Sequence, residues 1–204
     1  MLVDSHPLDS ENAKETFGFV PDDLPLPESL RYHEIVALHR RLRRQFDDEL
    51  GAHLTEVVGL SEHRWKYIGE YSHGMKKKLQ LVLALAHRPR LLVLDEPWRG
   101  LDPEAGILLR DILGGFVAQG GGALVSTHDL LGAESYCHRV VVIDKGRVVG
   151  EGELPGLLSD SGATSLEQYF IRAAHLEKRI ETTRGSISGI RFVGPDVGAT
   201  NASR

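Results

Sequence analysis

The sequence has a single cysteine, Cys137, among 204 residues. One cysteine excludes an intrachain disulfide framework and a zinc site built from several thiolates, and it fits a reducing compartment. No apolar run approaches the ~20 residues of a membrane-spanning helix, so we expect any membrane role to act through a partner. Residues 1–10 contain Asp4, His6 and Asp9 without an apolar core, so we expect no signal peptide there.

Positive charge is also in short supply. Lys and Arg total 24 against 29 Asp and Glu, for a formal net charge of −5. This balance argues against a general nucleic-acid binder, which would usually be basic. The apolar share of 41% and the charged share of 26% are those of an ordinary soluble globular protein.

The apolar pattern changes along the chain from helical to strand-like. Two continuous apolar runs, 91–94 and 123–126, predict strands buried on both faces. The helical pattern between them, from Pro103 to about Gln119, makes a strand–helix–strand unit with parallel strands. We further expect strands at 17–20, 139–144, 147–150 and 190–193, and helices at 28–50, 54–60, from Ser72 onward and 165–175.

Two adjacent carboxylates, Asp95 and Glu96, follow the first buried strand. In open α/β sheets, ligands bind at the carboxyl ends of the strands. Asp95 is placed to hold a hydrated Mg²⁺, and Glu96 to polarise a water molecule. Taken alone, two solvated acids at the end of a strand would be the better interpretation.

Three further groups gather around these acids in the sequence. Ser72-His73-Gly74 begins a helix whose open N–H groups could bind phosphate, or which is simply capped by Ser72. Asp102 precedes Pro103 at the next helix start and fits an ordinary cap. His128 ends the second buried strand, at the same sheet edge as the acids, where it could touch a γ-phosphate.

The order and spacing of these motifs resemble the nucleotide-binding domain of ABC transporter ATPases. Tyr71 through Met75 looks like their signature motif, and Leu91 through Glu96 resembles the Walker B strand with its catalytic glutamate. Gly100-Leu101-Asp102 resembles the D-loop, and His128 matches the switch histidine. The segment after the signature, Gly-Met-Lys-Lys-Lys, looks most like the exporter subset, in which the membrane subunit is usually a separate chain.

The resemblance extends in both directions, over residues 1 to about 175. Phe17 through Asp22 resembles the Q-loop region, residues 30–60 the helical subdomain, and residues 140–153 the closing hairpin. Asp22 stands where the family usually has Gln, and it could still accept a bond from a metal-bound water. His73 stands at a usual Gly position and adds bulk where the γ-phosphate docks.

The family's phosphate-binding loop, G-x-x-x-x-G-K-[ST], does not occur in this sequence. None of the 22 glycines is followed by lysine. That loop holds the phosphates through backbone N–H groups and its lysine, so we expect this chain alone to be inactive as an ATPase. We also expect apolar residues and strand edges of the sheet to be exposed.

The resemblance implies an α/β, P-loop NTPase-like fold with an N-terminally truncated ABC ATPase domain at 1–175. A helical subdomain would span about 23–88, and 176–204 would be a flexible tail. It further implies ATP and Mg²⁺ as cofactors, catalysis by Glu96 and His128, Mg²⁺ on Asp95 through water, and nucleotide contacts from Asp22, Ser72, His73, Gly74 and Asp102.

The implied function is ATP hydrolysis that energises export by a separate membrane permease. The chain would act as a homodimer or as a heterodimer with a complete ATPase domain, without nucleic acid. It would be cytoplasmic at the inner face of the cell membrane, which it would contact only through its partner. One alternative is an inactive or relic domain that contributes only its signature face to a dimer. Another is a soluble ABC ATPase without a transport role.

One metal motif is excluded by geometry. His33-Glu34 with His39 superficially suggests a zinc protease, whose two histidines stand four residues apart on one helix face. Here the second histidine comes six residues after the first, which places it on a different face.

Overall fold

The computed structural model describes residues 2–3, 6–7, 10–23, 25–188 and 190. These residues form two compact units, 1–128 and 129–204. The boundary between the units lies inside the domain predicted for 1–175. In the part of the chain that the structure describes, no helix is long and apolar enough to cross a membrane.

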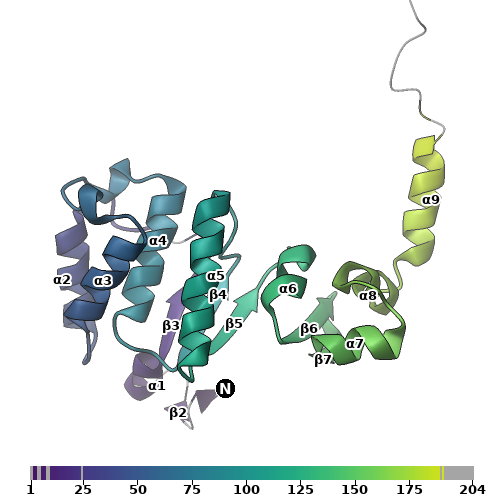
Figure 1. Ribbon diagram of the computed structural model, residues 1–204, viewed down its shortest axis with the longest axis horizontal. Helices are drawn as coiled ribbons and strands as arrows, with labels where there is room; N and C mark the ends of the chain where they lie inside the picture. Colours follow the sequence, from purple (N-terminus) through teal and green to yellow (C-terminus); the bar gives the residue numbers. More distant parts are fainter. Residues whose placement is uncertain (1, 4–5, 8–9, 24, 189, 191–204) are drawn as a thin grey trace, which may run out of the picture. The chain divides into compact units, whose positions relative to one another are not determined.

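The first unit is organised around a three-stranded parallel sheet in the order β3-β4-β5. These strands are β3 (Phe17–Val20), β4 (Leu91–Asp95) and β5 (Gly122–Ser126). Helices α4 (His73–Leu85) and α5 (Pro103–Ala118) pack on one face of it, over the fully buried Leu92 and Leu94 (Figure 1). The α/β fold with parallel strands predicted from the sequence is confirmed.

The expectation that both apolar strands are buried on both faces is wrong. Strand β4 alternates, with Leu92 and Leu94 buried and Val93 only half-buried, and most of β5 is exposed. Phe19 and Leu124, which flank Val93 in register, are 51% and 56% exposed. Among the described residues, α4 and α5 cover only the opposite face. The continuous apolar runs therefore predicted the strands correctly, but they did not predict which faces of the strands are covered.

The elements between residues 26 and 85 are helices, but their boundaries differ from those expected. One helix was expected over 28–50 and another over 54–60. The structure has α2 (Tyr32–Leu42), α3 (Asp48–Val57) and two short 3-10 helices, Ser61–His63 and Ile68–Glu70. The break comes from Asp47, whose carboxylate caps α3 at Leu50 and pairs with Arg88 at 2.6 Å.

The second unit contains the predicted hairpin. Strands β6 (Arg139–Asp144) and β7 (Arg147–Glu153) pair antiparallel. Lys145 and Gly146 both have positive φ, which suits a tight two-residue turn. Helices α6 (Leu130–Tyr136), α7 (Leu154–Ser161) and α8 (Leu166–Ala173) pack around the buried Val142. Ser165 caps α8, at the position where a helix is expected to begin.

Both ends of the chain contain elements that the sequence pattern did not predict. Helix α1 (Glu11–Thr16) precedes β3, and β1 (Leu2–Val3) pairs antiparallel with β2 (His6–Pro7). Helix α9 (Glu177–Ser188) lies in the segment expected to be a tail, and it has no buried residue. The strand expected at 190–193 lies largely outside the described residues, and Ile190 is not in a strand.

His87 gives the first unit a pH-dependent stability. Its side chain is 2% exposed, and its Nε2 donates to the Phe17 carbonyl at 3.1 Å. Burial lowers the pKa of His87, and the charge of Arg43 lowers it further. The Phe17 and Leu83 carbonyls and Glu15 raise this pKa, but they do not outweigh the burial. Burial also lowers the pKa of His39.

We predict that the free energy of unfolding falls as the pH drops below about 6.5. The unfolded chain binds protons there that the folded chain does not, so acid favours unfolding. Urea titrations at several pH values would measure the slope. His87→Gln should flatten it, leaving the part due to His39, and an unchanged slope would contradict this role for His87.

Candidate functional site

The predicted site lies at the carboxyl ends of β4 and β5. Parallel pairing sets Asp95 opposite Ser126, and the Ser126 hydroxyl donates to Asp95 Oδ1 at 2.5 Å. The Asp95 carboxylate is therefore oriented by the neighbouring strand and remains half-buried rather than fully solvated. Carboxylate oxygens of this kind are ligands that Mg²⁺ accepts.

Glu96 leaves the strand through an unusual backbone conformation. Its φ is +44°, a left-handed value that non-glycine residues seldom adopt. Its N–H donates to the Ser126 carbonyl at 2.8 Å. This turn separates the two carboxylates, because Asp95 stays on the strand while Glu96 turns toward residues 127–128.

The Glu96 carboxylate is held by three donors. The His128 backbone N–H and Nδ1 lie 2.8 and 2.6 Å from Oε1, and the Thr127 hydroxyl donates to Oε2 at 3.0 Å. Glu96 and His128 are thus in direct contact, as the sequence predicted for this sheet edge. Nδ1 must carry a proton to donate to an ionised carboxylate, so a neutral His128 presents Nε2 as an acceptor. The His128 side chain is 80% exposed.

The signature segment begins α4. Ser72 caps the helix, with its hydroxyl accepting from the Met75 N–H at 3.2 Å. The side chains of Ser72 and His73 are exposed, and Gly74 lies against Leu101 and the Gly100 carbonyl. The capping interpretation of Ser72 is therefore correct, and it leaves the first turn of the helix accessible.

His73 packs on the loop that follows β4. A Cβ placed at Gly100 would lie 2.8 Å from His73 Cδ2, and Gly100 has a φ of +74°. Two features therefore favour glycine at position 100: its positive φ, and the His73 imidazole that a Cβ would meet. Asp102 lies two residues further on and caps α5 by accepting from the Ala105 N–H at 2.8 Å.

Asp22 has cationic partners on both carboxylate oxygens. Lys77 Nζ lies 3.2 Å from Oδ1, and an Arg99 guanidinium nitrogen lies 2.6 Å from Oδ2. Partial desolvation raises the pKa of Asp22, but the hydrogen bonds from Lys77 and Arg99 outweigh it and lower the pKa. Asp22 is therefore held in ion pairs with Lys77 and Arg99, two partners that the sequence did not predict.

Sequence reasoning missed four residues that shape this site: Lys77, Arg99, Ser126 and Thr127. Ser126 and Thr127 could have been found, because Ser126 ends β5 and Thr127 stands between that strand and His128. Lys77 and Arg99 carry no such signal. They reach Asp22 from 55 and 77 positions away in the sequence.

We predict that Gly100→Ala lowers the free energy of unfolding by about 1 kcal/mol or more, because alanine is strained at positive φ. His73→Gly in the same chain should recover only the steric part. Gly114→Ala provides the matched control, since no atom lies within 4 Å of a Cβ there, and it should stabilise α5 by about 0.5–1 kcal/mol. Urea denaturation would measure all of these variants, and a neutral Gly100→Ala would contradict the strain.

Comparison with known proteins gives the same family throughout. The family described as ABC transporter matches residues 1–99. "Nod factor export ATP-binding protein I" of Burkholderia thailandensis is 34% identical over 189 residues, covering 90% of this chain and 62% of that protein. The linearmycin resistance ATP-binding protein LnrL of Bacillus subtilis is 28% identical, covering 80% of this chain and 53% of its own length. The chain thus spans about half to three fifths of these relatives.

A solved structure described as the ATP-binding subunit of an ABC transporter superposes with a TM-score of 0.76 at 27% identity. The match covers 84% of this chain and 74% of that one. Sequence and fold agree on the same family, and in this chain the pairing of β4 with β5 brings Asp95, Glu96 and His128 to one sheet edge. The chain belongs to the ABC transporter family.

Proposed function

We propose that this chain serves as the ATP-binding subunit of an export transporter, energising a separate membrane permease. The observation that carries the proposal is the Glu96–His128 pair beside Asp95 at the carboxyl ends of β4 and β5. A carboxylate and an imidazole in contact can orient a water molecule and a phosphate oxygen together. The relatives named above for export support the direction of transport.

Each residue has a distinct part in this proposal. Glu96 accepts a proton from the attacking water, and a His128 with protons on both ring nitrogens donates from Nε2 to the γ-phosphate while Nδ1 donates to Glu96. Asp95 would hold Mg²⁺ through water, with Ser126 fixing its orientation. The metal, when bound, supplies charge neutralisation on the phosphate oxygens.

The residues present fit part of a nucleotide site. The Asp95 carboxylate suits Mg²⁺, and the accessible first turn at Ser72 and Gly74 suits a phosphate. The 204 residues contain no G-x-x-x-x-G-K-[ST] loop to hold the β- and γ-phosphates. We therefore propose that the chain works in a head-to-tail dimer, in which Ser72, His73, Gly74 and Asp102 face a nucleotide held by a complete ATPase domain.

The remaining parts of the proposal concern location and contacts. We infer a cytoplasmic position at the inner face of the membrane, with membrane contact only through the permease. Residues 23–70 are the proposed surface for that permease, because the helical subdomain makes this contact in the family that the chain resembles. A second candidate function is a non-catalytic partner that contributes only the signature face, and the missing phosphate loop favours it.

The test is MgATP-dependent assembly with a complete ABC ATP-binding subunit from the same genome, co-expressed and trapped with vanadate. We predict that Ser72→Arg reduces co-purification at least tenfold, because the bulky cation fills the phosphate-facing turn. Ser165→Arg is the matched control, since it removes the same kind of cap from α8 in the other unit. Equal association of Ser72→Arg, Ser165→Arg and the unmodified chain would contradict the dimer.

The two candidate functions separate in the assembled complex. If Glu96 is the base, Glu96→Gln should leave assembly intact and lower the ATPase rate by about 10²-fold or more. A complex whose ATPase rate is the same with Glu96→Gln would support the non-catalytic role.

A further inference from the structure

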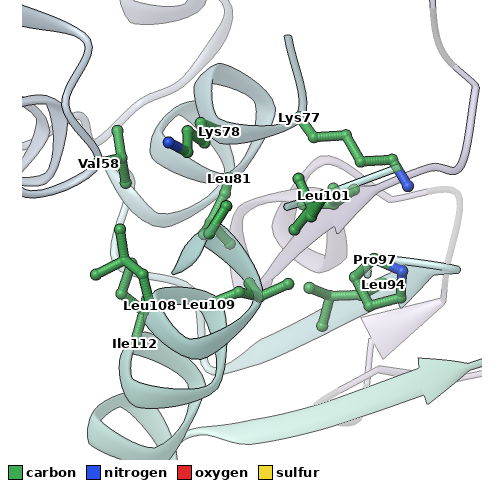
Figure 2. A pocket seen from close by; sticks show the side chains of 12 residues that line it. Val58, Lys77, Lys78, Leu81, Leu94, Pro97, Leu101, Leu108, Leu109 and Ile112 are labelled. Carbon is green, nitrogen blue, oxygen red and sulfur yellow. The ribbon is translucent and has the colours of Figure 1, made fainter. Parts of the chain in front are cut away.

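Three segments of the first unit meet at the Lys77 side chain. Lys77 lies one turn into α4 and is only 5% exposed. Its Nζ lies 3.2 Å from Asp22 Oδ1, on the loop after β3, and donates to the Glu96 carbonyl at 2.6 Å, on the loop after β4. Figure 2 shows Lys77 extending toward the Pro97 side, while the neighbouring Lys78 points to the opposite side, near Val58.

The hydrogen bond from Lys77 is made to Glu96, whose backbone conformation is seldom found for a residue other than glycine. Glu96 is left-handed at φ +44°, a strained conformation that persists only where the surrounding structure holds it. Its N–H is fixed by Ser126, and its carbonyl accepts from Lys77 and, at 3.1 Å, from the Arg99 N–H. The Lys77 ammonium donates from a side chain, whereas Arg99 donates from its backbone.

The charges explain why the ammonium stays in place. A buried ammonium is costly unless it is paired and hydrogen-bonded. Asp22 supplies the opposite charge, and Arg99 takes the second Asp22 oxygen at 2.6 Å from the solvent side. Because Arg99 binds the second oxygen of the Asp22 carboxylate, the first oxygen stays oriented toward Lys77.

We propose that Lys77 is a positioning residue, which holds the Glu96 backbone in its left-handed turn and so directs the Glu96 carboxylate toward His128. Ser72 and Gly74 lie in the first turn of α4, the helix that carries Lys77. A displacement of that turn would move Lys77 and, through its hydrogen bond, the Glu96 backbone. The effect on catalysis rests on the function proposed above. The effect on the Glu96 turn does not, and it can be measured in the chain alone.

Trp98 provides the probe. It stands two residues after Glu96 and packs against the core under α5, whereas Trp65 is 75% exposed. In a Trp65→Phe chain, Trp98 is the one remaining tryptophan, because the sequence has two. Acrylamide quenching of its fluorescence reports how tightly the loop after Glu96 is held.

We predict that Lys77→Met, which keeps the aliphatic stem, raises the acrylamide quenching constant of Trp98 at least twofold, and that Lys77→Arg restores it. Lys76→Met is the matched control on the same helix, since Lys76 pairs with Glu28 away from this loop. It should leave the quenching constant unchanged. If Lys77→Met does not fold, Asp22→Asn keeps Lys77 packed while weakening its pair, and a smaller increase is expected.

Two results would overturn the proposal: an unchanged quenching constant in folded Lys77→Met or Asp22→Asn, or an equal increase in Lys76→Met. In the assembled ATPase, Lys77→Met should lower kcat at least tenfold with KM within twofold. A loosened Trp98 with unchanged kcat would also overturn the positioning role. If the unmodified complex has no ATPase activity, the proposed function fails, while the quenching comparison still decides how the turn is held.

Discussion

The parallel register between β4 and β5 places the polar groups that follow these two strands. Because Asp95 lies opposite Ser126, the residues that follow each strand, Glu96 on one side and Thr127 and His128 on the other, leave the sheet at the same level. The carboxylate of one strand end then accepts from the hydroxyl, the N–H and the imidazole of the other. A register shift of one residue would turn Ser126 to the other face and remove its bond to Asp95.

That register depends on packing from one side only. Leu92 and Leu94 are buried under α4 and α5, and full burial of such side chains contributes about 1.5–3 kcal/mol each. On the other face, Phe19 and Leu124 remain half exposed or more. Parallel strands are usually covered on both faces, so the described residues account for one half of the packing that such a sheet normally has.

The sequence was informative where a local rule decides the structure. Asp102 before Pro103 predicted the start of α5, and Lys145-Gly146 predicted the hairpin, because caps and tight turns depend on adjacent residues. The helix expected over 28–50 failed for the opposite reason. Its interruption depends on Asp47, which pairs with Arg88 and donates its N–H to the Ala86 carbonyl. Periodicity within one segment does not reveal a partner forty residues away.

The same limit applies to the site. Spacing placed Asp95, Glu96 and His128 at one edge, since the ends of parallel strands meet there. It did not reveal the charge balance around Asp22. A carboxylate where the family usually has a neutral amide adds negative charge next to a site meant for anionic phosphates. Lys77 and Arg99 offset that charge from two different segments. With both cations in place, Asp22 pairs with Lys77 on α4, and Lys77 in turn donates to the Glu96 carbonyl.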